Sequence, residues 1–152
     1  MERLSTVFAN QQLDAIRADF ANGVLAIYSG TQPASADDAE TGDLLCLITQ
    51  NGQPFTAGQP TNGLNFAAPS DGVMDKAGGE VWAGIILKSG VAGWFRFYDN
   101  NYMTGASTTA KRFDGEISPL SSAELRMSLD MSNMTEGDTL ALETFQVHYR
   151  GE

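Results

Sequence analysis

The sequence contains little of the chemistry that most catalytic and metal sites need. Its 152 residues include one cysteine, Cys46, and one histidine, His148. A single cysteine excludes an internal disulfide, and one Cys with one His excludes the usual zinc sites. Cys46 lies in an apolar run, so we expect a buried structural thiol. His148 lies on the polar face of the last predicted strand, where we expect a solvated or interface residue and not a catalytic base.

Basic residues and long apolar runs are also scarce. Nine basic residues stand against 19 acidic ones, which gives a formal net charge of −10. Such a charge repels phosphate, so the composition argues against a nucleic-acid partner. No stretch approaches the ~18 apolar residues of a membrane span, and the first residues lack the apolar segment of a signal peptide. We therefore expect a protein that folds in a cytoplasm and has no membrane partner.

One segment has the apolar spacing of a helix. Ser5 is a suitable N-cap and Gly23 follows a suitable stop, so the sequence predicts an amphipathic helix over about residues 5–21. The apolar stripe of this helix contains Phe8, Leu13, Ile16 and Phe20. Two interpretations stay open: the stripe closes one end of the domain's own core, or it belongs to an arm that binds a neighbouring protein.

From residue 24 onward, apolar residues follow a period of two, which is typical of strands. About eight short strands are separated by turn signals, without alternating helices. The clearest predicted strands are Val24–Ser29, Leu44–Thr49, Val81–Lys88, Trp94–Asp99, Phe113–Ile117, Leu125–Met131 and Phe145–Tyr149. We predict a mostly β protein, an antiparallel β-sandwich or jelly roll over residues 24–152, with an N-terminal helical arm over residues 1–23.

Aromatic residues concentrate between residues 82 and 102. Arg96 alternates with Phe95 and Phe97, so we expect the two phenylalanines to face the core. About half of the aromatics in this region are needed simply to fill a core between two sheets. Trp94, Tyr98 and Tyr102 are the candidates for interface anchors or sugar-stacking platforms.

An acidic loop is the remaining candidate for chemistry. Residues 37–43 carry four carboxylates that could hold calcium, although they lack the spacing of an EF-hand loop. The simpler interpretation is a solvated acidic loop. Paired carboxylates for glycoside hydrolysis are not singled out among 19 acidic residues, and no phosphate-binding motif occurs. The sequence therefore predicts no catalytic residue, no metal ligand and no cofactor.

Several stretches of the chain carry a resemblance to known proteins. Leu4–Thr6 leads into the predicted helix, residues 28–37 read Tyr-Ser-Gly-Thr-Gln-Pro-Ala-Ser-Ala-Asp, and Gly93–Asp99 is followed by Asp114, Gly115 and a leucine-rich strand. In this order they resemble a family of small, mostly uncharacterised virion structural proteins of tailed bacteriophages, encoded among head and tail genes. The resemblance covers most of the chain apart from residues 50–80, and it carries no catalytic motif.

The resemblance implies a non-enzymatic virion component that is assembled in the host cytoplasm. The expected function is decoration or cementing of the head at the capsid surface. Alternatives are a tail, collar or connector component, or a carbohydrate-binding module of a tail fibre. The expected partners are other virion proteins, either the major capsid protein or tail and neck proteins. Separately, an unpaired edge strand favours self-association as a dimer or trimer.

Overall fold

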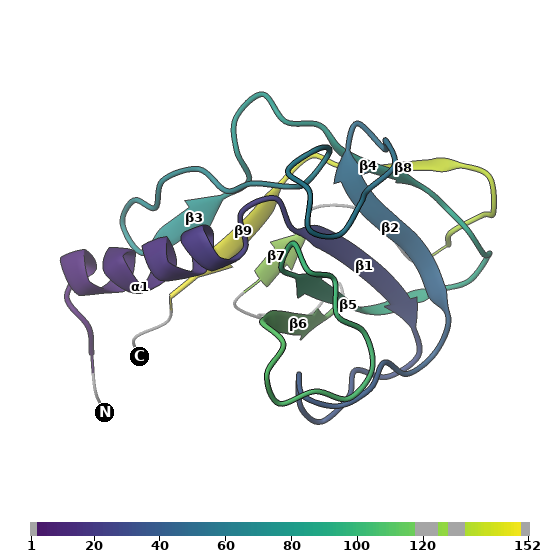
Figure 1. Cartoon of the computed structure of the whole chain (residues 1–152), viewed down its shortest axis with the longest axis horizontal. Coiled ribbons are helices and arrows are strands. Elements are labelled where there is room, and N and C mark those ends of the chain that lie inside the picture. The colour runs from purple at the N-terminus through teal and green to yellow at the C-terminus, as the bar shows by residue number, and fades with distance from the viewer. Residues whose placement is uncertain (1–2, 118–124, 128–132, 150–152) are drawn as a thin grey trace.

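The computed structural model describes residues 3–117, 125–127 and 133–149. Within these residues the chain forms one helix and nine strands (Figure 1). The elements are α1 (Thr6–Asp19), β1 (Val24–Ser29), β2 (Leu44–Gln50), β3 (Val73–Asp75), β4 (Trp82–Ile85), β5 (Ala92–Tyr98), β6 (Arg112–Glu116), β7 (Leu125–Met127), β8 (Thr139–Leu142) and β9 (Phe145–His148).

The strands form two antiparallel sheets. The larger sheet has the order β6-β5-β1-β2-β4-β8, and the smaller has the order β3-β9-β7. The chain passes from the larger to the smaller sheet between β8 and β9, across Glu143 and Thr144. The prediction of a mostly β, antiparallel, sandwich-like protein with one N-terminal helix is confirmed.

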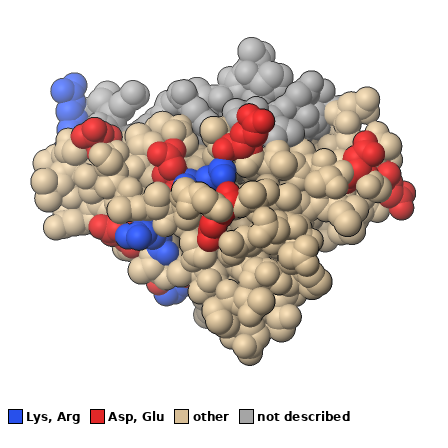
Figure 2. All heavy atoms as spheres, turned by 90° about the horizontal axis from the view of Figure 1, so that it is seen from above, with Lys and Arg blue, Asp and Glu red and all other residues tan. Residues whose placement is uncertain are grey.

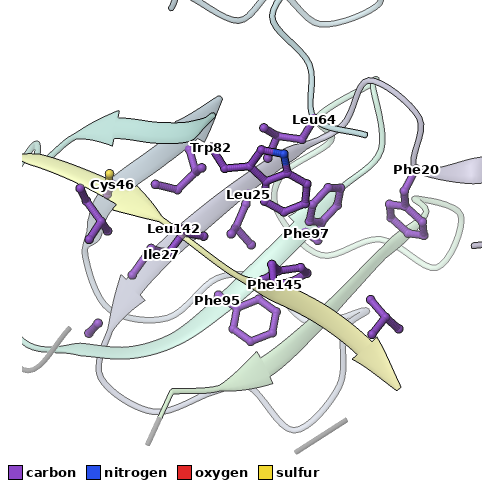
Figure 3. Close-up of a cluster of buried hydrophobic side chains, with 14 of the residues drawn as sticks. Phe20, Leu25, Ile27, Cys46, Leu64, Trp82, Phe95, Phe97, Leu142 and Phe145 are labelled. Atoms are coloured by element: carbon purple, nitrogen blue, oxygen red, sulfur yellow. The ribbon is translucent and has the colours of Figure 1, made fainter. Parts of the chain in front are cut away.

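The main hydrophobic core lies between the two sheets. Phe95 and Phe97 of β5 and Trp82 of β4 meet Phe145 of β9, and Figure 3 shows these rings gathered between the strands. The ring centroids of Trp82 and Phe145 are 5.4 Å apart, and those of Phe95 and Phe145 are 5.6 Å apart in an edge-on arrangement. Burial of each such ring contributes about 1.5–3 kcal/mol, so the aromatic cluster accounts for much of the attraction between the sheets. The expected inward orientation of the two phenylalanines is confirmed.

Helix α1 lies beside β3 and closes one end of this core (Figure 1). Its N-cap is Ser5, whose hydroxyl accepts a hydrogen bond from the backbone N–H of Phe8 at 3.3 Å. Leu13 and Phe20 are buried in the main core, and Ile16 packs against it partly buried. In the described residues, no helix is long and apolar enough to cross a membrane. Since Leu13, Ile16 and Phe20 pack into the core, the apolar stripe of the helix covers the protein's own core.

Some predicted strands differ in extent from the observed ones. The expected strand Val81–Lys88 is shortened to β4, although Ile86 and Leu87 still pair with β2 through a bridge to Cys46 and a hydrogen bond to the Leu45 carbonyl. Of the expected strand Leu125–Met131, β7 covers the first three residues, and residues 128–131 lie outside the described part. Cys46 is buried, as expected, and its Sγ lies 3.6 Å from the carbonyl oxygen of Ile85.

Candidate functional site

The second face of the large sheet is covered by loops over its middle strands. Five buried side chains from β1 and β5 form a separate apolar cluster there, which we call the outer cluster. Its members are Val24, Ala26, Tyr28, Trp94 and Tyr98. Partly buried residues from the covering segments, including Phe55 and Tyr102, pack against it. The middle of the sheet is therefore buried on both faces.

Arg96 is fully buried in this second layer, an outcome that the strand pattern alone did not predict. Its guanidinium donates to Asp114 Oδ2 at 2.8 Å, to the Asp38 carbonyl at 2.8 Å and to Glu40 Oε1 at 3.3 Å. Its Cζ also lies 5.1 Å from the centroid of the Trp94 ring. A buried guanidinium is tolerated only when its donors are paired, and these contacts supply the pairs.

Arg112 holds the same acidic loop from the neighbouring strand β6. Its guanidinium donates to the carbonyl oxygens of Ala36 at 2.6 Å, Asp37 at 3.1 Å and Met103 at 3.0 Å. Backbone carbonyls of the loop thus converge on two guanidinium groups. Among the described residues, no group of three or more His, Cys, Asp or Glu side chains is arranged to hold a metal ion.

The loop that was expected to be simply solvated is instead attached to the sheet through Glu40. The side chain of Glu40 is 15% exposed. One oxygen, Oε1, accepts from Tyr98 Oη at 2.6 Å, and the other, Oε2, accepts from the backbone N–H of Gly105 at 2.8 Å. The Tyr98 hydroxyl also lies 2.8 Å from that of Tyr28. The interpretation of residues 37–43 as a solvated loop is therefore incomplete.

The electrostatics of this network keep each group in its ordinary protonation state at neutral pH. Burial raises the pKa of Tyr28 to about 12. Burial, together with the hydrogen bond to Glu40, raises the pKa of Tyr98 further. Burial alone would raise the pKa of Glu40, but the hydrogen bonds from Tyr98 and Gly105 and the charge of Arg96 lower it below 4.5. Neutral tyrosines and a charged glutamate form a stabilising network, with no group poised to exchange a proton near pH 7.

The structure places the predicted interface residues in different surroundings. Trp94 and Tyr98 are buried in the outer cluster, where the Trp94 ring stacks on Tyr28 at 4.5 Å between centroids. Tyr102 is partly buried against Tyr98 and Phe55. In this structure Trp94 and Tyr98 therefore belong to the interior and present no ring face to a partner, because residues 34–43 and 99–105 cover them.

The predicted helix residues divide in the same way. Leu13 and Phe20 are buried in the core, and Ile16 is partly buried beside them. Phe8 keeps 45% of its surface exposed, near the outer end of α1. Of the four, Phe8 is the one that presents a large apolar surface to solvent.

One group of exposed large apolar side chains lies near the β8 edge of the large sheet, on β4 and the residues beside it. Trp82 faces the main core, so Val81, Ile85 and Leu87 face outward. Their exposed fractions are 50%, 56% and 54%, respectively. We call this surface, together with Thr139 and Ala141 of the adjoining β8, the open face. Sequence reasoning missed it because the run Val81–Lys88 has apolar residues at both odd and even positions. Such a run does not indicate which side of the strand stays exposed.

Comparison of the chain with protein-family models, with curated proteins and with solved structures finds no match.

Proposed function

We propose that this chain is a non-enzymatic virion protein of a tailed bacteriophage that acts by binding other protein surfaces, most specifically as a head decoration protein. The observation that carries the binding role is the open face. Three large aliphatic side chains, one on β4 and two just beyond its ends, are each half exposed or more. Apolar patches of this kind on otherwise well-packed proteins mark sites of protein contact. The virion assignment is supported by the sequence resemblance.

The interior of the protein supports a binding role over a chemical one. The ionisable and phenolic groups that cluster on β5 and β6 are engaged in holding the acidic loop. No buried side-chain nitrogen or oxygen in the described residues lacks a hydrogen-bond partner. The rigid second layer is a scaffold that positions the sheet, and the open face is the surface that the scaffold presents.

The charge of the chain favours a position on the outside of a capsid. A formal net charge of −10 repels packaged DNA and keeps an exterior protein soluble. Burial of Trp94 and Tyr98 leaves no support for a sugar-stacking platform at those rings.

Purified virions test this proposal directly. Quantitative mass spectrometry and cryo-electron microscopy should detect the chain in the particle, with copies on the order of hundreds for a head protein. About six to twelve copies would instead place it in the tail, collar or connector. Particles that are complete without this chain would contradict the proposal as a whole.

A further inference from the structure

Among the residues that the structure describes, strand β8 is an edge strand without the usual protection. It is the last strand of the six-stranded sheet, and its sequence Thr139–Leu142 contains no charged residue, proline or glycine. Natural sheets usually block such edges with charges, proline or a bulge, because open backbone groups pair readily with another strand. The edge formed by β8 is therefore suited to accept an added strand.

The hydrogen-bond pattern shows which groups of β8 are available. Ile86 N–H donates to the carbonyl of Asp138 at 2.8 Å, at the start of the β4–β8 ladder. In an antiparallel ladder, residues that exchange hydrogen bonds with one neighbour alternate with residues that do not. Because Asp138 bonds to Ile86, the residues two and four positions later, Leu140 and Leu142, form their backbone hydrogen bonds with β4. The N–H and C=O groups of Thr139 and Ala141 then point away from the sheet.

Side chains of the open face would support such a strand on one side. Ala141 lies opposite Ala83, and Thr139 lies opposite Ile85 on β4. Val81 and Leu87 lie on the same side of the strand beyond the two ends of β4, and Ala83 between Val81 and Ile85 is buried. A strand added to β8 would place alternate side chains beside this apolar surface.

Acidic residues flank β8 on both sides. Asp138 precedes the strand and Glu143 follows it, both are exposed, and neither carboxylate forms an ion pair with another described residue. Figure 2 shows carboxylates gathered, without adjacent Lys or Arg, at the end of the molecule where β8 lies in Figure 1. If two copies paired antiparallel through the outward groups of Thr139 and Ala141, Asp138 of one would lie opposite Leu142 of the other, next to its Glu143. This arrangement repels a second copy and favours a strand with basic ends.

We propose that β8 binds an extended segment of a partner protein as an additional strand, and that this segment has a short apolar, β-branched centre flanked by Lys or Arg. The inference rests on the proposed protein-binding function and specifies how binding occurs. Main-chain hydrogen bonds from Thr139 and Ala141 provide affinity, the open face receives alternate side chains, and Asp138 and Glu143 select basic flanks.

A labelled synthetic peptide tests the backbone contribution. The probe alternates valine and threonine between terminal lysines, and its binding to the full chain is measured by fluorescence anisotropy. Ala141→Pro removes an outward N–H without removing a hydrogen bond to β4, so it should weaken binding roughly tenfold. Ala141→Val keeps the N–H and changes the side chain alone, so it should weaken binding far less than Ala141→Pro does. Circular dichroism and thermal melting verify that both variants fold.

A second pair of measurements tests whether Asp138 and Glu143 select a peptide with basic ends. A peptide with glutamate in place of the terminal lysines should bind roughly tenfold more weakly, since two attractions become repulsions. The double variant Asp138→Asn, Glu143→Gln should reduce the preference for the lysine peptide and its dependence on salt. An Ile85→Ser variant, which shortens a side chain of the open face, should also weaken binding.

Three results would overturn the inference: equal binding of both peptides, unchanged binding by Ala141→Pro, or a dimer of the chain that Ala141→Pro dissociates. Detection of the chain in purified virions tests the proposed function separately from strand addition at β8. Virions that contain the chain, with no peptide binding, would refute strand addition and leave the proposed function standing. Peptide binding by a chain that virions lack would refute the virion assignment and leave strand addition standing.

Discussion

Cys46 is a residue whose chemistry is set by burial. The thiol is enclosed in the main core, and burial raises its pKa to about 12. Because the thiolate is the reactive species, the native protein should react very slowly with a thiol reagent at pH 8. Reaction should become fast in a concentration of denaturant that unfolds the chain. Native protein that reacts as fast as a free cysteine peptide would show that the core opens readily around β2.

Glu40 links the stability of the protein to pH. Its pKa is lowered in the folded state, so its contribution to stability is fully present above about pH 4.5, the ordinary value, and is lost as the pH falls through the lowered pKa. Glu40→Gln should reduce the free energy of unfolding by about 1–3 kcal/mol at pH 7, because Tyr98 and Arg96 lose a charged acceptor. The loss should shrink below the lowered pKa.

Urea denaturation across pH 3–7 measures this effect. Asp37→Asn is the matched control, since that residue is exposed in the same loop and its carboxylate makes no hydrogen bond or ion pair within the described residues. The control should change the free energy of unfolding by less than about 0.5 kcal/mol. Equal effects of the two substitutions would contradict the role assigned to Glu40.

At the scale of elements, helix α1 is a structural part of the sandwich. Leu13→Ala removes a side chain that is buried in the main core, and it should cost about 2–5 kcal/mol of unfolding free energy. Phe8→Ala lies on the same helix but at an exposed position, and it should cost far less. Chemical denaturation of the two variants measures the difference. Similar small losses would show that the helix detaches readily and would favour the interpretation as a mobile arm.

The acidic loop is the second element whose position depends on distant side chains. Arg112→Lys keeps the charge but cannot donate to three carbonyls in one plane. Backbone amides of residues 34–43 should then exchange hydrogen at least about tenfold faster, while β1 and β2 remain protected. Hydrogen exchange followed by mass spectrometry measures this, with Lys111→Gln, an exposed neighbour, as the control. Unchanged exchange in the loop would contradict the proposed attachment.

At the scale of the whole molecule, net charge controls association. The isoelectric point is near 4.3, so the self-repulsion that a charge of −10 provides at pH 7 disappears there. Light scattering across pH 4–8 should show the greatest association near pH 4.3. A maximum near neutral pH would instead indicate a specific self-interface, in line with the dimer or trimer that stays a prediction.

The sequence by itself determined the helix and most of the longer strands of this protein. Apolar, β-forming runs that end at turn signals set β1 and β2, and alternation set β5, all close to their observed bounds. Ser5 and the apolar stripe that follows it set α1, because these patterns depend on local backbone geometry. It also correctly assigned Phe95 and Phe97 to the core.

Only the tertiary structure decided what covers each face of the large sheet. Alternation separates the two faces of a strand, but whether a loop lies over one of them depends on contacts between residues far apart in sequence. Arg96, Trp94 and Tyr98 are buried because residues 34–43 fold over them, more than 50 positions away. Ile85 and Leu87 stay exposed, since no segment in the described part of the chain folds over them. Long-range packing of this kind decided that the open face at β4 and β8 remains accessible, and no local sequence pattern indicated it.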